Sequence, residues 1–510
     1  MRWHELLAVL PATRLVGAGG DPEVQELTYD SRMARPGSVF VAIRGFNVDG
    51  HAYAEEAVAK GAVALVVERP LPGLEVTVPQ AVVQDTRAAL ADLSVRFYGN
   101  PAAKLRLIGV TGTKGKTSTT YLVKAILEAV GQKVGLIGTI QNLIGSEPLP
   151  THRTTPESLD LQELFAQMRQ AAVQSVVMEV SSHALVLQRV RGCRFSVAVF
   201  TNISRDHLDF HRTFEEYLDA KAGLFRLLAQ EGKGPRPGEP PAMVVNRDDA
   251  HWTTIARAGE GSRLITFGVE SEEADIRATD VHTSLAGTTF TVHTRTEQFP
   301  LRLHLVGVFN VYNGLAALGV AQALGLDLRT AGQALAGVLG VPGRFERIEQ
   351  GQPFLVVVDY AHSPDSLERV LQAASDLKPR ALRVVFGCGG DRDRGKRPLM
   401  GAIAARQADD VIITSDNPRS EEPESICRAI EEGFLQVPQP RARSYQVIVD
   451  RRQAIRYALA RAGPGDLVLI AGKGHEDYQE VAGGRIHFDD REVARQLLGE
   501  LGYRGESARR

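Results

Sequence analysis

The chain of 510 residues is too long for one hydrophobic core, and at roughly one domain per 150 residues we expect about three domains. Hydrophobic residues make up 44%, charged residues 24% and the formal net charge is −2, so bulk electrostatics indicates neither a nucleic-acid partner nor a membrane surface. Cys193, Cys388 and Cys427 lie far apart, which excludes a disulfide framework or a structural zinc motif and is typical of a reducing cytoplasm. The first apolar run is too short for a signal peptide, and no stretch approaches the roughly 18 apolar residues of a membrane span.

Residues 1–100 predict a small α/β domain. Strand-like runs at 38–43 and 62–68 alternate with turns, and residues 52–60 have a helical pattern. Asp30-Ser31-Arg32 puts hydrogen-bonding groups beside a strand end, where they could hold a ligand or form a plain turn. Tyr98-Gly99-Asn100-Pro101 stops the preceding helix and is the predicted hinge to the next domain.

Residues 105–120, LRLIGVTGTKGKTSTT, predict a phosphate-binding loop between a strand and a helix. Gly112 and Gly115 allow backbone torsions that turn N–H groups inward, and Lys116 would bring a positive charge to the β/γ-phosphates of a nucleotide. Thr117 would open the helix with a hydroxyl placed for magnesium. The usual pattern G-x-x-x-x-G-K-[ST] has glycine where Val110 stands, so the match is partial and a chance glycine-rich turn is the alternative.

Residues 101–335 alternate apolar runs with helical patterns, which predicts a parallel sheet with ligands at the carboxyl ends of its strands. The run at 175–180 ends in Glu179, Ser181, Ser182 and His183, and the run at 197–200 is followed by Thr201, Asn202, Ser204, Asp206, His207 and Asp209. An oxygen of Glu179 and a nitrogen of His207 suit a partly hydrated magnesium ion. Each group alone would be a helix cap or a core residue, but together beside a phosphate-binding loop they indicate a metal site.

One lysine falls within an apolar helical stripe. The stripe consists of Phe214, Tyr217, Leu218, Leu224, Phe225 and Leu228. Lys221 lies inside it, and the ordinary interpretation is a stem that snorkels its charge to the surface. The alternative is a buried amine with a lowered pKa, which can react with carbon dioxide to form a carbamate.

Residues 307–317, GVFNVYNGLAA, place Asn310 and Asn313 one turn apart on one side of a forming helix. Asparagine in an apolar helix start suggests recognition of a base or sugar, and helix capping is the alternative.

From residue 336 onward a second alternating pattern predicts a third domain with a dinucleotide-binding type of fold. Strand-like runs lie at 354–358, 382–386, 410–414 and 467–470. No G-x-G-x-x-G follows the first run, so NAD binding is not predicted. Polar or glycine-rich loops begin at Asp359, Gly387, Asp416 and Gly472. One such loop would be a solvated rim, but four at one sheet edge predict a site for a zwitterionic small molecule.

The motifs along nearly the whole chain resemble, in order, those of the Mur ligases. The shared stretches are GTKGKTS at 112–118, THRTTPE at 151–157, MEVSSHAL at 178–185, FTNISRDHLDFH at 200–211, GVFNVYNGLAA at 307–317, PGRFE at 342–346, DYAHSPDSL at 359–367, GCGGDRDRGKRPLMG at 387–401, DNPR at 416–419 and GKGHEDYQ at 472–479. Within the family, the chain is similar to the synthetases that add the third residue to UDP-N-acetylmuramoyl-dipeptide.

The resemblance implies an α/β fold of three domains. These are a small N-terminal α/β domain that binds the UDP substrate (1–100), a central P-loop parallel-sheet ATPase domain (101–335) and a C-terminal Rossmann-like domain that binds the amino acid (336–510). It further implies an ATP-dependent ligase of bacterial peptidoglycan synthesis that joins the D-glutamate carboxylate to an amine through an acyl phosphate. We expect a cytoplasmic monomer that uses ATP, Mg²⁺ and carbamylated Lys221, with the UDP-muramoyl-dipeptide and a diamino acid as its other substrates.

The family pattern also assigns residues to sites. ATP would be bound by Gly112, Thr113, Lys114, Gly115, Lys116, Thr117, Ser118, Asn313, Arg344 and Asp359. The UDP substrate would be bound by Ser31 and Asn47 at the uridine end and by Thr154, Thr155, Ser181 and Arg189 at the muramoyl-dipeptide. Metal ligands would be Thr117, Glu179, His207 and the Lys221 carbamate, and the catalytic residues would be Lys116, Lys221 and His362. A core histidine is the alternative for His362, and Leu187 replaces a glutamine that some members carry two residues before the arginine.

The amino-acid site would consist of Arg392, Asp416, Asn417, Arg419, Gly472 and Glu476. In the family, D-N-P-R accompanies meso-diaminopimelate, whose far carboxylate would bind the fork of Arg419 and whose far ammonium would bind Asp416 and Glu476. We therefore predict meso-diaminopimelate, with lysine or ornithine as the alternative. A ligase like folylpolyglutamate synthetase would lack the N-terminal uridine-binding domain, and a GTPase-like switch would need an N-K-x-D motif after the phosphate-binding loop.

Overall fold

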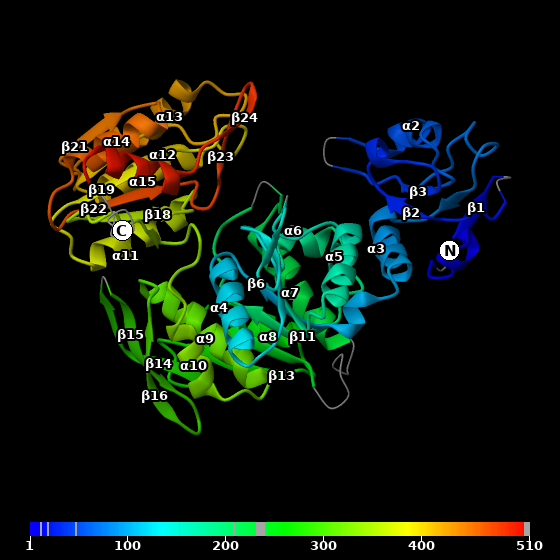
Figure 1. The fold of residues 1–510 in the computed structure, drawn as a ribbon, viewed down its shortest axis with the longest axis horizontal. Helices are drawn as coiled ribbons and strands as arrows, with labels where there is room; N and C mark the ends of the chain where they lie inside the picture. The colour runs from blue at the N-terminus through cyan, green and yellow to red at the C-terminus, as the bar shows by residue number, and fades with distance from the viewer. Residues whose placement is uncertain are drawn as a thin grey trace. The chain divides into compact units, whose positions relative to one another are not determined.

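The computed structural model describes residues 1–10, 13–17, 20–45, 48–151, 153–207, 210–230, 240–284 and 286–503 (Figure 1). The chain forms two compact units, Met1–Ala274 with Ala316–Leu328 and Asp275–Leu315 with Arg329–Arg510. None of the helices in these described stretches is long and apolar enough to cross a bilayer.

The N-terminal part of the first unit is a small five-stranded sheet with helices. Its strands are β1 (Arg14–Val16), β2 (Glu26–Thr28), β3 (Ser38–Val41), β4 (Ala64–Val67) and β5 (Gln80–Val82), in the order β1-β5-β4-β3-β2. Its helices are α1 (Trp3–Leu7), α2 (Ala54–Ala59) and α3 (Thr86–Phe97), with 3-10 turns η1 (Ser31–Met33), η2 (Gly50–Tyr53) and η3 (Pro101–Lys104). The predicted strands at 38–43 and 62–68 and the helix at 52–60 are confirmed with shorter bounds.

The predicted break after the third helix is also present. Asp85 caps the start of α3 by accepting from the backbone N–H groups of Arg87 and Ala88. The helix ends where Gly99 and Asn100 adopt left-handed torsions, with φ of 69° and 54°. The next strand, β6, starts only after the turn η3.

A second, larger sheet carries the phosphate-binding stretch. Its strands in the first unit are β6 (Arg106–Thr111), β7 (Val134–Ile137), β8 (Asn142–Ile144), β9 (Glu147–Leu149), β10 (Ser175–Glu179), β11 (Phe195–Phe200), β12 (Ala242–Asn246) and β13 (Arg263–Gly268). The helices are α4 (Lys116–Ala129), α5 (Ser158–Gln170), α6 (Ser182–Val186), α7 (Phe214–Gln230) and α8 (Trp252–Ala258), and α9 (Val308–Ala323) runs from the second unit into the first.

The strand order explains where a ligand can bind. The order is β13-β12-β11-β6-β10-β7-β8-β9, and the strands from β13 to β7 are parallel. Strand β6 therefore lies between β10 and β11, so the loops that follow these three strands meet at one edge of the sheet. Every residue of β10 and β11 is buried, as expected for a sheet with both faces covered.

The second unit contains an antiparallel meander, a six-stranded sheet and a two-stranded hairpin. An antiparallel meander, β14 (Ile276–Ser284), β15 (Gly287–His293) and β16 (Gln298–Leu303), departs from the predicted strand and helix alternation. The six-stranded sheet has the order β17-β18-β22-β19-β20-β21, with β17 (Glu346–Arg347), β18 (Leu355–Asp359), β19 (Leu382–Phe386), β20 (Asp410–Ile413), β21 (Ser444–Val447) and β22 (Leu467–Ala471). The hairpin is β23 (Tyr478–Val481) and β24 (Gly484–His487), and the helices are α10 (Leu328–Ala336), α11 (Pro364–Asp376), α12 (Lys396–Gln407), α13 (Pro423–Leu435), α14 (Arg451–Arg461) and α15 (Asp490–Glu500).

Helices cover both faces of this six-stranded sheet. Val384 and Leu469 pack into one apolar cluster with side chains of α11, α12 and α13. Val385 and Ile470, the next residues along the same strands, pack into a second cluster with α14 and α15. Alternation of this kind is what a parallel strand buried on both faces requires, and it confirms the Rossmann-like prediction.

Candidate active site

The phosphate-binding loop has the backbone that the glycine pattern predicts. Gly112 has a φ of 148°, and a Cβ there would come within 1.9 Å of Thr201 Oγ1. Gly115 has a φ of 85° and precedes the first residue of α4. Lys116 folds back over the loop, where its Nζ donates to the carbonyls of Gly112 (2.8 Å) and Thr113 (2.9 Å). The partial motif match at position 110 thus does not prevent a phosphate-binding conformation.

The end of β11 holds this loop in place. The backbone N–H of Thr113 donates to the carbonyl of Asn202 (2.8 Å), and the N–H of Lys114 donates to the Asn202 side chain (3.0 Å). Thr201 Oγ1 donates to the carbonyl of Lys114 (2.7 Å). Lys114 Nζ forms an ion pair with Asp206 at 3.1 Å. Asn202 therefore binds two successive N–H groups of the loop, one with its carbonyl and one with its side chain. This role was not predicted from its position after a strand.

Glu179 lies directly against the first turn of α4. Its Oε1 accepts from Thr117 Oγ1 (3.0 Å) and from the backbone N–H of Thr139 (2.8 Å), and its Oε2 accepts from Thr139 Oγ1 (3.0 Å). A Cβ at Gly138 would come within 2.6 Å of Oε1, so glycine is needed beside this carboxylate. Thr117 and Glu179, both predicted metal ligands, are thus hydrogen-bonded to each other, and neither Gly138 nor Thr139 was predicted from the sequence.

Lys221 is buried beneath the phosphate-binding loop. Only 1% of the residue is exposed, so the snorkelling interpretation is wrong. Its Nζ donates to the carbonyl of Gly112 (2.8 Å) and lies 4.4 Å from the ring centroid of Tyr217. Burial, together with the charges of Lys116 and Lys114, holds the pKa of Lys221 well below its usual range. Burial therefore favours the neutral amine over the ammonium, and the neutral amine is the form that a carbamate requires.

His207 belongs to a group of aromatic rings near the same loop. Its ring lies 5.0 Å from that of His183 and 6.0 Å from that of Tyr217, centroid to centroid. Burial lowers the pKa of His207, and the nearby lysines act in the same direction. Within the described residues, no three His, Cys, Asp or Glu side chains come together as a metal-binding group. His183 followed a strand end in the sequence, but its role beside His207 was not predicted.

Of the four residues predicted to hold the muramoyl-dipeptide, Thr155, Ser181 and Arg189 are linked by hydrogen bonds at the end of β10, and Thr154 contacts Thr139. Thr155 Oγ1 donates to the carbonyl of Glu179 (2.9 Å) and accepts from the backbone N–H of Ser181 (3.2 Å). Arg189 Nη1 donates to the carbonyl of Thr155 (3.1 Å), and Thr154 Oγ1 lies 3.0 Å from Thr139 Oγ1.

A buried carboxylate supports Arg189. Glu157 Oε1 accepts from Arg189 Nε (3.0 Å) and also forms an ion pair with Arg153. Arg87, on α3, lies 3.4 Å from the other oxygen of Glu157. Glu157 stands in the THRTTPE motif but was not singled out from the sequence.

The two residues predicted at the uridine end are less informative. Ser31 lies in η1, where its hydroxyl donates to Glu56 on α2 (2.9 Å). Asn47 lies outside the described residues.

In the second unit, the four predicted loops follow neighbouring parallel strands. The strands β18, β22, β19 and β20 stand side by side in this order, so their loops share one edge. At the end of β18, Asp359 accepts from the backbone N–H groups of Phe345 (2.7 Å) and Ala361 (2.8 Å). The guanidinium of Arg344 lies 4.7 Å from the ring centroid of Tyr360, and His362 Nδ1 donates to the Tyr360 carbonyl (2.8 Å). Arg344 thus packs against the loop after β18, which carries Asp359 and His362.

The asparagine pair of α9 makes a local contact. Asn310 donates from its side chain to the carbonyl of Val306 (2.9 Å), a local side-chain-to-backbone bond and not a helix cap. Asn313 donates to the Asn310 side chain (3.0 Å).

Two residues of the predicted amino-acid site, Asn417 and Glu476, are joined by hydrogen bonds around a buried lysine. Lys473 is fully buried, and its Nζ donates to Asn417 (3.1 Å) and Glu476 (3.2 Å). Asn417 also donates to Glu476 (2.9 Å). Gly472 has a φ of 121°, and a Cβ there would come within 2.4 Å of an Asp416 oxygen. Lys473 stood in the GKGHE motif, but its central position here was not predicted.

The two carboxyl groups of this site have pKa values moved in opposite directions. Burial would raise the pKa of Asp416, but the charges of Lys473 and Arg451 outweigh burial and lower it. Burial raises the pKa of Glu476, although Lys473 opposes the shift. Asp416 is therefore the more firmly anionic partner for a ligand ammonium.

Arg419 is held in a fixed direction. It adopts a left-handed backbone, with φ of 54°, and its N–H donates to the carbonyl of Glu480 (2.9 Å). Its Nε donates to the Glu480 carboxylate (2.9 Å) and its Nη1 to the carbonyl of Gly390 (2.7 Å). Arg392 is exposed on the same loop as Gly390 and donates to the carbonyl of Asp391 (3.1 Å).

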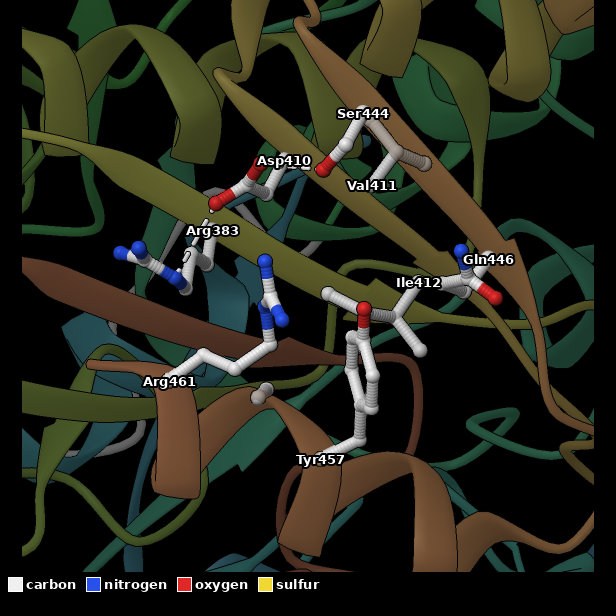
Figure 2. Close-up of a pocket in the computed structure, with 9 residues that line it drawn as sticks. Arg383, Asp410, Val411, Ile412, Ser444, Gln446, Tyr457 and Arg461 are labelled. Atoms are coloured by element: carbon white, nitrogen blue, oxygen red, sulfur yellow. Dashed lines mark hydrogen bonds and ion pairs between the residues drawn. The ribbon is translucent and has the colours of Figure 1, made fainter.

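A separate hollow lies at the opposite edge of this sheet. Arg383, Asp410 and Ser444, which line it, stand at the starts of β19, β20 and β21, whereas the four loops follow the strand ends (Figure 2). Tyr457 and Arg461 of α14 line its other side (Figure 2). None of the predicted site residues lines this hollow.

Comparison with known proteins identifies relatives over nearly the whole chain. Family models match at residues 23–98 (Mur ligase family, catalytic domain), 110–321 (Mur ligase middle domain) and 343–474 (Mur ligase, glutamate ligase domain). A protein of Geobacillus thermodenitrificans is 48% identical over 500 residues, 98% of this chain and 100% of the relative, and a protein of Caldanaerobacter subterraneus is 47% identical over 486 residues, 94% and 96% of the two chains. Both are named UDP-N-acetylmuramoyl-L-alanyl-D-glutamate--2,6-diaminopimelate ligase.

A solved structure of a protein with this same name is also similar. It is 35% identical, with a TM-score of 0.65, over 94% of this chain and 95% of that one. This match confirms the predicted three-domain α/β fold class, while the domain boundaries stay a prediction.

Proposed function

Because the chain belongs to the Mur ligase family, we propose that it is an ATP-dependent ligase that joins meso-diaminopimelate to the D-glutamate of UDP-N-acetylmuramoyl-L-alanyl-D-glutamate in peptidoglycan synthesis. One structural observation supports this reaction most directly. Glu179 accepts a hydrogen bond from Thr117, in the first turn of α4. Through Thr139 it is also connected to Thr154, one of the residues predicted to hold the muramoyl-dipeptide. An arrangement of this kind brings a nucleotide phosphate and an acceptor carboxylate to one place.

The reaction needs groups that reduce the repulsion between two anions. The D-glutamate carboxylate attacks the γ-phosphorus of ATP, the bond to the β,γ-bridging oxygen breaks, and an acyl phosphate and ADP result. Lys116 and the N–H groups at the start of α4 stabilise the charge on the transferred phosphoryl group. The amine then attacks the acyl carbon, and the tetrahedral intermediate expels phosphate and loses a proton.

The oxygen ligands at the loop fit a magnesium ion. Mg²⁺ in proteins takes one or two carboxylates together with phosphate and water oxygens, and Thr117 and Glu179 supply a hydroxyl and a carboxylate side by side. These two residues would hold the ion, which when bound supplies positive charge against the phosphate oxygens. The Thr117 hydroxyl donates to Glu179, so the two oxygens lie 3.0 Å apart. His207 and a carbamate on Lys221 are the further ligands in our proposal.

The remaining contacts are assigned as follows. ATP is held by Gly112, Thr113, Lys114, Gly115, Lys116, Thr117, Ser118, Asn313, Arg344 and Asp359. The UDP substrate is held by Ser31, Asn47, Thr154, Thr155, Ser181 and Arg189, and the amino acid by Arg392, Asp416, Asn417, Arg419, Gly472 and Glu476. Closure of the C-terminal domain over the central one would exclude water from the acyl phosphate. The three cysteines are free buried thiols, which supports a cytoplasmic enzyme, and we propose that it acts as a monomer.

Phosphate release tests the function. Purified protein with Mg·ATP is expected to release phosphate only when both the UDP-muramoyl-dipeptide and diaminopimelate are present, because the acyl phosphate forms on one substrate and is consumed by the other. A coupled phosphate assay, with mass spectrometry of the UDP-muramoyl-tripeptide, measures both outcomes. Equal phosphate release with either substrate omitted would refute the proposal. Ligation of glutamate to a folate, with no ligation of the UDP substrate, would favour the folylpolyglutamate-type alternative.

His362 provides a second test. Its Nδ1 donates to the Tyr360 carbonyl, which fixes the ring in the loop after β18. Replacing His362 with glutamine is expected to lower kcat by about ten- to a hundredfold if the ring acts on the transferring phosphate. The dependence of the rate on magnesium concentration should stay unchanged.

The control for this variant is His487→Gln, which alters an exposed histidine paired with Glu492. It should keep normal turnover. A His362→Gln enzyme with normal kcat and a raised magnesium requirement would indicate that His362 is a metal ligand instead.

A further inference from the structure

Thr139 forms a hydrogen-bonded bridge between two parts of the proposed site. Its hydroxyl donates to Glu179 Oε2 (3.0 Å) and lies 3.0 Å from the hydroxyl of Thr154, while its backbone N–H donates to Glu179 Oε1 (2.8 Å). It stands in the loop after β7, next to β10 in the sheet. The bridge therefore runs from Thr117 through Glu179 and Thr139 to Thr154.

Each threonine hydroxyl in the bridge has one proton, so the donor and the acceptor of each hydrogen bond can be deduced. The Thr139 hydroxyl has one proton, and the Glu179 carboxylate accepts it. The contact between the two threonine hydroxyls then requires Thr154 to donate and Thr139 to accept. With its proton used in this way, the Thr154 oxygen faces any ligand as an acceptor only.

The backbone around the bridge leaves little room for another arrangement. A Cβ at Gly138 would lie 2.6 Å from Glu179 Oε1. The backbone therefore passes so close to the carboxylate that only glycine fits at position 138. Glu179 and Thr155 are buried, and Thr155 Oγ1 donates to the Glu179 carbonyl (2.9 Å). Glu179 and the 154–155 segment are thus joined at two points, through the Glu179 backbone carbonyl and, by way of Thr139, through its carboxylate.

We infer that Thr139 is a positioning residue for the ligation reaction. It fixes Thr154 as a hydrogen-bond acceptor for an N–H or O–H group of the UDP-muramoyl-dipeptide, and it aligns that acceptor with Glu179 beside the phosphate-binding loop. This inference rests on the proposed function and adds a residue that the family pattern did not assign. Thr139 acts through Thr154 in substrate binding and through Glu179 in turnover.

The test uses Thr139→Val, which removes the hydroxyl but keeps the shape and the backbone N–H. Titration calorimetry should show UDP-N-acetylmuramoyl-L-alanyl-D-glutamate binding about tenfold more weakly, because a hydrogen bond in a network that includes a charged group is lost. The kcat should fall by a similar factor. Thr139→Ser should restore most of both values, since the hydroxyl returns.

A double substitution separates positioning from general damage. If Thr139 acts on binding through Thr154, the Thr139→Val/Thr154→Val enzyme should bind the UDP substrate no more weakly than Thr154→Val alone. The matched control is Thr151→Val, because among the described residues the Thr151 hydroxyl lies near backbone carbonyls, those of Gly138 (3.4 Å) and Arg153 (3.1 Å), and near no predicted site side chain. It should leave binding and turnover near wild type.

Three results would overturn the inference: normal binding and turnover in Thr139→Val, equal damage in Thr139→Ser, or fully additive losses in the double variant. A wild-type protein that neither binds nor ligates the UDP substrate would instead refute the proposed function.

Discussion

Replacing Lys221 with alanine is expected to reduce kcat by about a thousandfold, as the loss of one preorganised charged group at a phosphoryl-transfer site can do. The amine is buried under Gly112, and its lowered pKa favours the neutral form. A neutral amine adds carbon dioxide and releases a proton, which gives a carbamate with a carboxylate end. The positive charges of Lys116 and Lys114, which disfavour an ammonium at this position, would stabilise that anion.

The pH dependence of this modification has a definite sign. Carbamate formation releases a proton, so falling pH and removal of carbon dioxide both drive the group back to the amine. We expect enzyme stripped of carbon dioxide at mildly acidic pH to lose activity and to regain it when bicarbonate is added. A carbon-13 resonance from labelled bicarbonate should mark the carbamate in wild type and be missing from Lys221→Ala.

Chemical rescue and a matched lysine complete the Lys221 experiment. A small carboxylic acid such as formate should partly restore Lys221→Ala, because it supplies the missing carboxylate. Lys124→Ala removes another lysine of the same unit, one paired with Glu128 on α4, and should retain near-normal activity. Normal turnover of Lys221→Ala at low bicarbonate would show that the carbamate proposal is wrong.

The burial of Lys221 could be predicted because the helix pattern is local. Six apolar residues spaced along α7 define one face, and Lys221 falls within it. The same holds for the strand ends, since Glu179 and Asp359 close apolar runs that the sequence delimits within about one residue. Local periodicity was sufficient for these elements.

The partners across the sheets could not be predicted, because strand order is not written in local sequence. Strand β22 lies between β18 and β19, although it is the last of the three in the chain. That insertion brings Lys473 to Asn417, which lies 56 residues earlier. Likewise β7 and β10 are neighbours, and this places Thr139 against Glu179.

Other features were not predicted because the local sequence pattern that would indicate them is weak. The antiparallel strands β14 to β16 alternate buried and exposed residues over long stretches, but their polar, threonine-rich sequence resembles loop. Arg451 and Asp490 form a fully buried ion pair, with the guanidinium also donating to the carbonyls of Ser415 and Ala471. Neither residue stands in a motif, and only the folded chain shows that they support the strand ends beneath the amino-acid site.

Replacing Arg419 with alanine is expected to lower kcat/KM for meso-diaminopimelate by about a hundredfold, as the loss of a charged, bidentate hydrogen-bond partner predicts. The structure holds the guanidinium through Glu480 and Gly390, so its remaining donors keep their direction at little further entropic cost. In our proposal these donors bind the far carboxylate of the amino acid. Lysine and ornithine lack that carboxylate, so their poor kcat/KM should change far less.

The comparison that decides the amino acid uses all three amines with three enzymes. Wild type should prefer meso-diaminopimelate, because lysine and ornithine would leave the charge of Arg419 unpaired. Arg419→Lys keeps a charge but loses the fork, and it should recover only part of the selectivity. Arg441→Ala removes an arginine paired with Asp409 and should behave as wild type. A wild type that prefers lysine or ornithine would refute the assignment, and so would an Arg419→Ala enzyme that keeps its selectivity for meso-diaminopimelate.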